Sequence, residues 1–432
     1  MVNSSLCKAL LGNREFSQHA RPLRVLLLAA WLSGFAAAGQ TAELGERIQI
    51  DRESLPAPYA EPSHANGPER IPRPQGASLK VPAGFTVRLF ADGLVHARWL
   101  CATPDGDVFL AEPNAGEVTL LRDRDGDGRA EFHSTYLEGL RRPHGLAFRE
   151  GVLYVADTER VWRVSHRKGA TKGTAEPITP PGELGAGSGH WTRNLALHPD
   201  GTRFFVAIGS RGNLGEEPEP RATIREFPIT GGPGKTFAAG LRNPVGIAFY
   251  PGTEDLYTVV NERDGSGDEL VPDYLTRVRA GEFYGWPYAY LGPNPEPRFA
   301  ALNPALVAKT KAPDLLFRSH SAPLGLVFYD GVRFPETYRG DAFVALHGSW
   351  NAGVPRGYMV VRVPFENGQP QGWYEPFVTG FRIKEKAGAE ERARVWGRPS
   401  GLALLPDGSL LIADDVGNRV WRVAYEGADG GP

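Results

Sequence analysis

Histidine and arginine residues recur at one point of a repeated sequence pattern, directly before an apolar stretch that is typical of a strand. The set comprises His96 and Arg98; Arg141, Arg142 and His144; His190, Arg193 and Asn194; Arg242 and Asn243; His320; and Arg398. Solvated turns explain scattered charges, but they do not readily explain Arg or His at the same point of each copy. Guanidinium groups bind carboxylates and phosphates through paired N–H donors. We therefore interpret the set as a ring of donors around a pocket for an anion with several carboxylates or phosphates.

His190 lies in the segment GSGHWTRNLALHPDG, just before the third such apolar stretch. A neutral imidazole is well matched to taking a proton near neutral pH, so our hypothesis is that His190 is a general base. The alternative is a loop histidine that hydrogen-bonds to the backbone. His144, His320 and His347 are further candidates for the pocket.

Arg242 and Asn243 lie in GLRNPVGIAF, before the fourth apolar stretch. The planar guanidinium of an arginine suits a carboxylate or a developing oxyanion. The alternative is a surface arginine followed by an Asn-Pro turn.

A long insertion, residues 261–290, combines acids, glycines and aromatic residues. Its oxygen-bearing candidates for a Ca²⁺ site are Asn261, Glu262, Asp264, Asp268 and Glu269. Its aromatic residues, which could stack on a flat ligand or pack the loop, are Tyr284, Trp286 and Tyr288.

A second acidic segment, DRDGDG at residues 123–128, resembles the start of a calcium loop. Asp123, Asp125 and Asp127 have the spacing of the first ligands, but the twelfth position is Ser134 and flanking helices are not expected. The alternative is an acidic turn between outer strands.

The elements that must position these residues form a weak sixfold repeat of short apolar strands and Pro-Asp-Gly-like turns. Its copies are residues 99–112, 144–157, 194–209, 244–260, 323–346 and 400–415. Proline presets φ and glycine accepts a positive φ, so these turns predict hairpins. Six units of one pattern predict an all-β fold, a six-bladed β-propeller over residues 81–427. We expect residues 84–94 to supply an outer strand that closes the ring against the last blade.

The N-terminal segment, residues 1–42, has a basic start, an apolar run from Val25 to Ala38 and small residues after it. This pattern predicts a secretory signal peptide, and hence a periplasmic or secreted protein without stable membrane insertion after cleavage. The alternative is a membrane anchor, for which the apolar run is short. Residues 43–80 are rich in proline, and we expect a linker or a strap on the domain surface.

The composition excludes several classes of protein. With 48 Lys and Arg against 50 Asp and Glu, the formal net charge is −2, which argues against a general nucleic-acid binder. Two cysteines are too few for a disulfide scaffold or a cysteine-ligated zinc site. The 53 glycines and 37 prolines indicate many tight turns and short strands.

Four motifs in a fixed order carry a family resemblance: HWTRNL (190–195), GLRNPVGIAF (240–249), NERDGSGDEL (261–270) and EFYGWP (282–287). With them the sequence resembles the soluble glucose/sorbosone dehydrogenases, six-bladed propellers that use pyrroloquinoline quinone (PQQ) and Ca²⁺. RWLCATPDGDVFLAE, RPHGLAF, HGSWN and GRPSGLALLPDG look closest to the sorbosone and pyranose dehydrogenase branch. The resemblance covers about residues 81–425.

The resemblance implies roles for individual residues. His190 matches the base that takes the proton from the sugar's anomeric hydroxyl while a hydride passes to the quinone C5, and Arg242 matches the residue that stabilises the resulting oxyanion. The implied cofactor contacts are Arg142, Arg242, Asn243, Tyr284, Trp286, Arg356 and Arg398. Asp264 and Gly265 stand where the glucose-oxidising branch supplies backbone carbonyls to Ca²⁺ from a Gly-Pro pair.

The function that this implies is PQQ-dependent oxidation of an aldose or sugar aldehyde, with a cytochrome or quinone as electron acceptor. Three alternatives remain open. One is a propeller lactonase or other hydrolase that uses a channel Ca²⁺. Another is a non-catalytic propeller that binds carbohydrate or protein. The last is a family member that has lost the cofactor.

Overall fold

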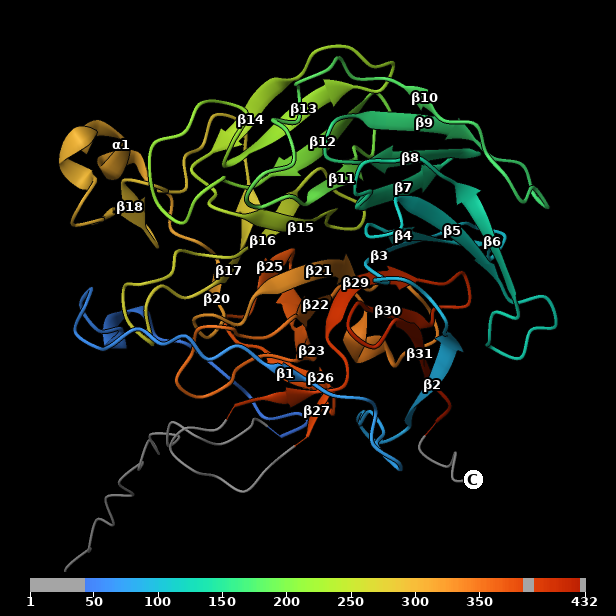
Figure 1. Ribbon diagram of the computed structural model, residues 1–432. Helices are drawn as coiled ribbons and strands as arrows, with labels where there is room; N and C mark the ends of the chain where they lie inside the picture. Colours follow the sequence, from blue (N-terminus) through green and yellow to red (C-terminus); the bar gives the residue numbers. More distant parts are fainter. Residues whose placement is uncertain (1–42, 384–391, 428–432) are drawn as a thin grey trace, which may run out of the picture. The chain divides into compact units, whose positions relative to one another are not determined.

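The computed structural model describes residues 43–383 and 392–427 (Figure 1). The predicted signal peptide, residues 1–42, lies outside these described residues. Among the described residues, no helix is long and apolar enough to cross a membrane.

Strands dominate the described chain, and most of them belong to six four-stranded antiparallel sheets, which we number along the chain. Sheet 1 contains β3 (Trp99–Ala102), β4 (Val108–Glu112), β5 (Glu117–Arg122) and β6 (Phe132–Leu137). Sheet 2 contains β7 (Gly145–Arg149), β8 (Val152–Ala156), β9 (Val161–Ser165) and β10 (Glu176–Pro177). Sheet 3 contains β11 (Arg193–Leu197), β12 (Arg203–Ile208), β13 (Thr223–Pro228) and β14 (Lys235–Ala239).

The other three sheets each contain one strand that does not follow directly on the third: in sheets 4 and 5 it comes after an insertion, and in sheet 6 it comes from before sheet 1. Sheet 4 contains β15 (Pro244–Phe249), β16 (Leu256–Val260), β17 (Tyr274–Val278) and β20 (Leu315–Leu316). Sheet 5 contains β21 (Pro323–Phe328), β22 (Ala342–Leu346), β23 (Met359–Val363) and β26 (Glu375–Val378). Sheet 6 contains β29 (Pro399–Leu404), β30 (Leu410–Asp414), β31 (Arg419–Tyr425) and β2 (Phe85–Ala91).

Short elements lie in the connections. They are the pairs β18 (Ala289–Tyr290) with β19 (Asn294–Pro295) and β24 (Phe365–Glu366) with β25 (Gln369–Pro370); β1 (Glu69–Arg70), β27 (Arg382–Ile383) and β28 (Arg394–Val395); the helix α1 (Pro304–Lys309); and the 3₁₀ turns Arg52–Ser54, Ala300–Leu302 and Glu336–Tyr338. Pro304 begins α1 and the Asn303 side chain accepts a hydrogen bond from the Leu306 amide, a regular N-terminal cap.

The first strands of the six sheets form a closed ring, in which β3, β7, β11, β15, β21 and β29 each contact the next and β29 contacts β3 (Figure 1). The other strands of each sheet lie outward, and apolar side chains fill the space between neighbouring sheets. Phe109 of sheet 1 and Leu153 of sheet 2, both fully buried, belong to one such layer. The arrangement is a β-propeller, which confirms the all-β prediction, and the strands fall on the six predicted repeats.

The ring is closed by pairing the strand before the first repeat with the last strand of the sixth repeat. β2 pairs antiparallel with β31, with Phe85 opposite Tyr425 and Arg88 opposite Arg422. Residues 84–94 therefore supply the outer strand of the last sheet, and that prediction is confirmed. Antiparallel hydrogen bonds here hold the strand that precedes the first repeat in the sheet of the last repeat.

Glycines in the innermost strands let neighbouring strands approach closely. A β-carbon at Gly145 would lie 2.5 Å from the Arg193 carbonyl oxygen, and one at Gly401 would lie 2.7 Å from the Arg98 carbonyl oxygen. These contacts leave no room for a side chain. Glycine recurs at this position because only glycine lets the neighbouring inner strands pack this closely.

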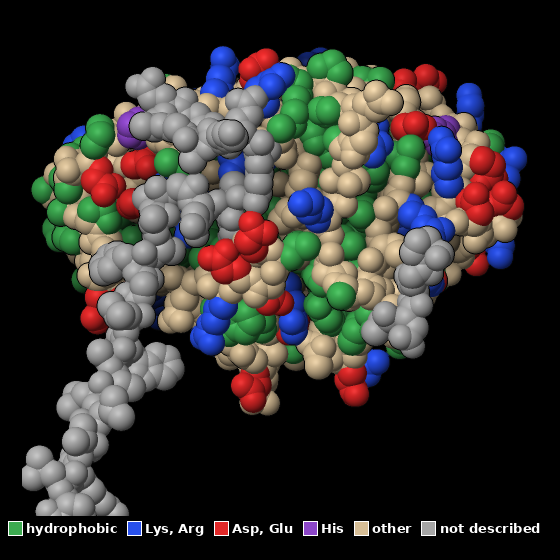
Figure 2. Space-filling view, turned by 90° about the horizontal axis from the view of Figure 1, so that it is seen from below, with side chains coloured by type: hydrophobic (Ala, Val, Ile, Leu, Met, Phe, Trp, Pro, Cys, Tyr) green, Lys and Arg blue, Asp and Glu red, His purple; other side chains and the backbone are tan. Residues whose placement is uncertain are grey.

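Residues 43–80 run over several sheets as a strap. Ile48 pairs with Tyr374 beside sheet 5, and the Tyr59 amide donates to the Ser266 carbonyl, 2.6 Å away, in the β16–β17 loop. The strand β1 then runs parallel to β28, before sheet 6. Figure 2 shows acidic and basic side chains interspersed over one face of the molecule, in keeping with a net charge near zero.

Replacing Gly401 with valine tests the close approach of the inner strands. The new side chain must displace the backbone of sheet 1 at Arg98, so we expect G401V to cost about 1–3 kcal/mol of stability. The measurement is the thermal unfolding midpoint followed by circular dichroism. G67A, where the nearest atom to the new β-carbon is 4.0 Å away, is the control. An unchanged midpoint for G401V would contradict the packing argument.

Candidate active site

Most of the candidate residues lie at one end of the ring, which we call the mouth. It is formed by the segments that precede the first strand of each sheet and by the loops between the second and third strands. Because successive strands are antiparallel, both kinds of segment lie at the same end. The contact between His190, before β11, and Ser210, in the β12–β13 loop, is one example.

His190 is held by its Nδ1 atom. Nδ1 lies 2.9 Å from the Ser210 carbonyl oxygen and 3.0 Å from the Ser210 hydroxyl oxygen. A carbonyl can only accept, so Nδ1 carries the proton in the neutral ring and Nε2 has the lone pair. Within residues 43–383 and 392–427, Nε2 has no hydrogen-bond partner. The geometry therefore gives His190 a free basic nitrogen.

The environment of His190 keeps the imidazole neutral. Burial, and then the positive charge of Arg242, lower the pKa of His190 to about 4. Both effects disfavour the imidazolium, and they outweigh the Ser210 hydrogen bond and the charge of Asp264, which favour it. At neutral pH the ring is thus unprotonated.

Two arginines hold the His190 segment through backbone carbonyls. Arg193, fully buried, donates to the carbonyls of Leu184 (2.7 Å), Ala186 (2.7 Å) and His190 (3.0 Å). Arg221 also donates to the Ala186 carbonyl at 2.8 Å. Burial, and then the charge of Arg221, lower the pKa of Arg193 to about 9. The result is a loop fixed by cations on both sides.

Arg242 has all five of its N–H groups directed to protein acceptors. Nε donates to the Asn213 carbonyl at 3.0 Å, and Nη1 donates to the carbonyls of Asn261 and Glu262 at 3.2 and 2.7 Å. Nη2 donates to Asn213 Oδ1 at 2.8 Å and to Asp264 Oδ2 at 3.1 Å. The sequence analysis expected the Arg242 guanidinium to be available for a ligand. In the structure its N–H groups are directed to protein acceptors instead.

Asn213 connects the β12–β13 loop to the insertion. Its carbonyl accepts from both Arg242 and Trp286 Nε1, each at 3.0 Å. Its amide donates to the Asp264 carbonyl, and its Oδ1 accepts from the Asp264 amide, both at 2.8 Å. The sequence analysis missed Asn213, because RGN in a polar turn has no distinguishing pattern.

Asp264 is the acid of this network. Its carboxylate also accepts from Asn351 Nδ2 at 2.7 Å, and His320 Nδ1 lies 3.6 Å away. Burial alone would raise the pKa of Asp264, but His320 and Arg242 outweigh it and hold that pKa below its ordinary value. Burial likewise would lower the pKa of His320, but Asp264 and Asp273 outweigh it and the net pKa is raised.

The predicted Ca²⁺ loop has few uncommitted oxygens. The Asp264 carbonyl accepts from Asn213, the Ser266 carbonyl accepts from Tyr59, and the Gly267 carbonyl accepts from His320 Nε2 at 3.2 Å. Gly265 is exposed, with φ +88° and open space around it. Asp264 and Gly265 together offer fewer than the six to eight oxygens that Ca²⁺ takes.

Arg356 and Arg398 differ in how far the protein occupies them. Arg356 contacts the carboxylates of Asp268 and Glu269, each at 2.6 Å, and both acids belong to the insertion. Arg398 donates to the carbonyls of His347 and Gly348 through Nε and Nη2, and its Nη1 has no hydrogen-bond partner in the described chain.

The aromatic candidates separate into two kinds. Tyr284, 2 % exposed, lies in an apolar cluster of sheets 3 and 4, and its hydroxyl donates to the Arg277 carbonyl at 2.6 Å. The structure therefore does not bring Tyr284 to the mouth, since its ring is used in packing. Trp286, although 3 % exposed, reaches Asn213 and so borders the Arg242 network.

Asn243 lies beside His190. A β-carbon at Gly209 would contact both Asn243 Oδ1 and the His190 β-carbon, so these two side chains flank the same glycine. Asn243 Oδ1 is buried and has no hydrogen-bond partner in the described chain. The same is true of Asn194 Nδ2 and Thr192 Oγ1. Buried polar atoms are rarely left unpaired, which indicates that this part of the mouth accommodates water or a ligand.

Trp191, next to His190, is the centre of a group that we call the Trp191 cluster, comprising Trp191, His96, Arg98, Arg142 and His144. The guanidinium carbon of Arg142 lies 4.0 Å from the centre of the indole, and that of Arg98 lies 5.6 Å away. The rings of His144 and His96 lie 5.5 and 6.4 Å away. The sequence analysis named each of these residues as a candidate except Trp191. The contacts of Trp191 with Arg142 and Arg98 can be seen only in the folded structure.

Asp415 connects this cluster to sheets 5 and 6, of which sheet 6 is the neighbour of sheet 1 in the ring. The buried carboxylate lies 2.5 Å from Arg98 Nη1 and 2.9 Å from His347 Nε2. Arg98 belongs to sheet 1, whereas His347 and Asp415 belong to loops of sheets 5 and 6. Burial, and then the charge of Arg398, lower the pKa of His347 to about 3. Arg141 and Arg142 are both exposed, but Arg141 is paired with Glu159.

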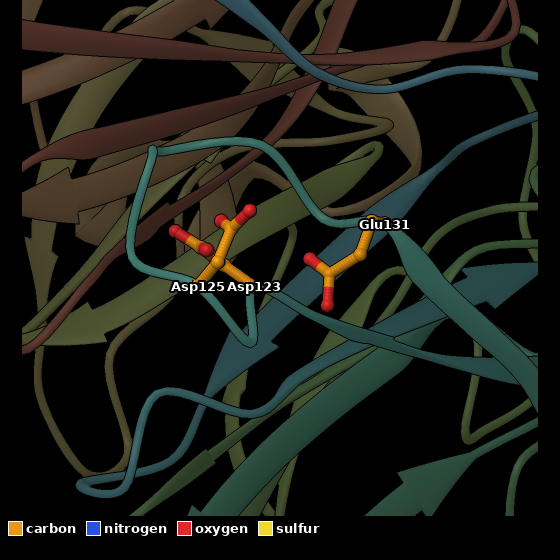
Figure 3. A group of neighbouring side chains, drawn as sticks. All are labelled: Asp123, Asp125 and Glu131. Carbon is orange, nitrogen blue, oxygen red and sulfur yellow. The ribbon is translucent and has the colours of Figure 1, made fainter.

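The second acidic segment is an acidic turn on sheet 1, between β5 and β6. The carboxylates of Asp123, Asp125 and Glu131 gather there (Figure 3), within 4.8 Å of one another. Asp123 accepts from the amides of Gly126 and Gly128 at 2.7 and 2.9 Å. Backbone amides thus donate hydrogen bonds to a carboxylate of this cluster. This agrees with the alternative interpretation of the segment, an acidic turn between outer strands.

Comparison with known proteins places the chain in a family. The TrAA12-like family model matches residues 79–271 and 303–426, and the Glucose / Sorbosone dehydrogenase model matches residues 227–350. The chain belongs to the TrAA12-like family, and its resemblance to the glucose/sorbosone dehydrogenases is confirmed.

Individual relatives agree in fold and extent. An uncharacterized protein of Borreliella burgdorferi is 28% identical over 366 residues, 81% of this chain and 92% of the relative. The holo pyranose dehydrogenase PQQ domain from Coprinopsis cinerea superposes with a TM-score of 0.68 at 20% identity, covering 83% of this chain and 99% of that domain. A calcium structure of a Trichoderma reesei AA12 enzyme gives 0.67 at 20% identity, with coverages of 82% and 100%.

Histidine titration tests the electrostatics of the site. We expect the His190 imidazole to titrate near pH 4, because burial and Arg242 disfavour its charged form. The measurement is NMR of ¹⁵N-histidine-labelled protein from pH 3 to 8, with the signal assigned by its loss in H190A. Titration of that signal near the ordinary 6.5 would contradict the proposed environment.

Proposed function

We propose that this protein is a PQQ-dependent sugar dehydrogenase that oxidises an aldose or a sugar aldehyde, and that its six sheets are the blades of a six-bladed propeller. The observation that carries the proposal is His190, a neutral imidazole with a free Nε2 at the mouth, flanked by unpaired buried polar atoms and by cations. The family match to sugar dehydrogenases supports the same reaction class.

The residues at the mouth fit a flat anion with several carboxylates. Arg142 has no ion-pair or hydrogen-bond partner within residues 43–383 and 392–427, and Arg398 has a free Nη1. Asn243 and Asn194 add unpaired amide atoms. We propose that these residues hold PQQ, with Trp286 bordering the site through Asn213. Bound there, PQQ would supply a two-electron oxidant.

The chain's own groups then have defined tasks. His190 Nε2 would take the proton of the sugar hydroxyl at the carbon being oxidised, while Ser210 holds Nδ1–H and so fixes the reacting tautomer. Arg242 would act as a fixed positive charge that favours negative charge on the ligand. Its protein contacts hold it rigidly, so its contribution does not require reorientation.

Calcium remains part of the proposal with a limited ligand set. Asp264, whose carboxylate is anionic, and the open carbonyl of Gly265 would be its protein ligands, and water or the cofactor would supply the others. We assign no step of the reaction to the metal.

The cellular setting is proposed from the N-terminal sequence. Residues 1–42 would direct export, which gives a periplasmic or secreted enzyme. Electrons would pass to a cytochrome or a quinone, and the substrate would be a small sugar.

Reconstitution tests the proposed function directly. We expect the mature protein, freed of metal and cofactor, to reduce an artificial dye only when PQQ, Ca²⁺ and a sugar are all added. The measurement is dye absorbance across a panel of aldoses and sugar aldehydes, with sugar lactones assayed in parallel for hydrolysis. Lactone hydrolysis without PQQ would favour the hydrolase, and absence of PQQ binding would contradict the cofactor assignment.

Loss of the base should separate chemistry from binding. We expect H190A to lower kcat by about 10²–10⁴-fold, the usual value of general-base catalysis, while its affinity for PQQ changes little. The measurements are dye-linked kinetics and calorimetric PQQ titration. H133A, on the outer strand β6, is the control. A fully active H190A would refute the role.

A further inference from the structure

One residue of the strap, Asn66, holds the β22–β23 loop of sheet 5 on both sides of a single residue. The Asn66 backbone amide donates to the Trp350 carbonyl at 2.8 Å. Its side-chain Nδ2 lies 3.2 Å from the Ala352 carbonyl oxygen and 3.3 Å from the Gly353 carbonyl oxygen. The residue enclosed by these three acceptors is Asn351, so Asn66 fixes the backbone from which the Asn351 side chain extends.

Asn351 uses its amide group at the mouth. The side chain is buried, and its Nδ2 lies 2.7 Å from Asp264 Oδ1 and 3.0 Å from His320 Nδ1. His320 Nε2 lies 3.2 Å from the Gly267 carbonyl oxygen, which can only accept, so Nδ1 is the acceptor in the neutral ring. An amide nitrogen has two hydrogens, and these two contacts use both. The orientation of the Asn351 amide is therefore defined by two partners.

The two oxygens of the Asp264 carboxylate are held from different loops. Oδ1 accepts from Asn351, and Oδ2 accepts from Arg242 Nη2 at 3.1 Å. A carboxylate has about four lone-pair positions, so two N–H contacts fix its plane and leave positions open for a cation. Arg242 is itself anchored on Asn213, whereas the backbone of Asn351 is anchored on the strap.

We propose that Asn66 is a positioning residue, which fixes Asn351 and thereby orients the Asp264 carboxylate for Ca²⁺. The inference rests on the proposed function, in which Asp264 is a ligand of the metal. Asn66 lies before residue 79, where the match to the family model begins, so the resemblance gives it no role. A residue that hydrogen-bonds to a metal ligand sets the affinity for the metal by fixing the direction of that ligand.

The strap also binds the β16–β17 loop, which carries the carboxylate. The Tyr59 backbone amide donates to the Ser266 carbonyl at 2.6 Å. The Glu61 carboxylate accepts from the Glu269 backbone amide at 3.1 Å. The strap thus contacts both of the loops whose side chains meet at the proposed ligand, and it can set the position of one loop relative to the other.

Ion pairs join the same two loops independently of the strap. Arg356 contacts the carboxylates of Asp268 and Glu269, each at 2.6 Å. These contacts act beyond Asn351 in the loop, whereas Asn66 holds the backbone on both sides of it. Loss of the Asn66 side chain should therefore leave the loops joined and change the orientation of the side chain that they enclose.

The first test follows amide hydrogen exchange by mass spectrometry, in protein to which no metal or cofactor is added. We expect N66A to speed exchange about three- to tenfold in residues 349–354 and 262–266, because two hydrogen bonds to the loop are lost. R52A is the control, since Arg52 makes a strap hydrogen bond of the same kind to the Pro313 carbonyl. It should leave both segments at the wild-type rate.

A second variant separates the hydrogen bonds from the shape of the side chain. N66D keeps the shape but, when ionised, has no side-chain donor, so we expect it to exchange as N66A does. Faster exchange in residues 349–354 without a change in residues 262–266 would overturn the proposal, because Asn66 would then act on its own loop alone.

The second test measures Ca²⁺ binding to the metal-free protein by calorimetry. We expect N351A to bind Ca²⁺ about 10–100-fold more weakly than the wild type, the usual effect of removing a residue that holds a metal ligand. We expect N66A to bind it about three- to tenfold more weakly, because Asn66 acts one step further away. If Asn66 acts through Asn351, the double variant N66A/N351A binds Ca²⁺ as N351A does.

The outcomes distinguish the proposal from its alternatives. Effects of N66A and N351A that multiply in the double variant would overturn it. A purely structural role of Asn66 would lower the melting temperature of N66A and leave its Ca²⁺ affinity at the wild-type value. A wild type that binds no Ca²⁺ refutes the calcium assignment of the proposed function, and the exchange rates then decide separately whether Asn66 acts on Asp264.

Discussion

The pairing of β2 with β31 is the interaction on which the mouth depends, because it brings the strand before the first repeat and the last strand of the sixth repeat into one sheet. The polar groups at the mouth come from different sheets and face each other only when the ring is closed. Arg98 of sheet 1 meets Asp415 of sheet 6, and Arg142 of sheet 2 stacks on Trp191 of sheet 3. An open ring would separate the first of these pairs and leave buried charges without compensation.

A second constraint is that Arg193 and Arg221, which fix the His190 segment, are held by carbonyls rather than by acids. Carbonyl oxygens satisfy the N–H groups of Arg193 and Arg221 but do not cancel their charge. Desolvation of these cations is costly, and the loop that supplies the carbonyls must be rigid to compensate it. The positive potential that remains disfavours an imidazolium at His190 and favours an anionic ligand, so one arrangement serves both needs.

The fold could be predicted from the sequence because each repeat carries local signals. Turns such as Pro104-Asp105-Gly106 and the glycines Gly145 and Gly401 act within or between adjacent strands, where short-range patterns are informative. The strand at residues 84–94 could be assigned because the sixth repeat otherwise lacked an outer strand.

The candidate site could be predicted only in part, because residue type does not reveal what a side chain already contacts. His190 and Arg142 keep the free groups that the hypothesis requires. Arg242 and Arg356 have acceptors that lie in other loops, and the sequence offers no sign of them. Tyr284 was expected near the ligand because the motif EFYGWP is aromatic, yet its hydroxyl finds the Arg277 carbonyl and its ring fills the core.

The strap explains why the mouth has two unlike sides. The Tyr59 backbone amide donates to the Ser266 carbonyl and the Asn66 backbone amide donates to the Trp350 carbonyl at 2.8 Å, so the strap binds loops of sheets 4 and 5. The same loops carry Asp268, which engages Arg356. Backbone and ion-pair contacts thus use up the polar groups on that side, and the groups that stay available lie beside Trp191 and His190. Unpaired cations give that side a positive potential, and His190, with its free Nε2, lies on the same side.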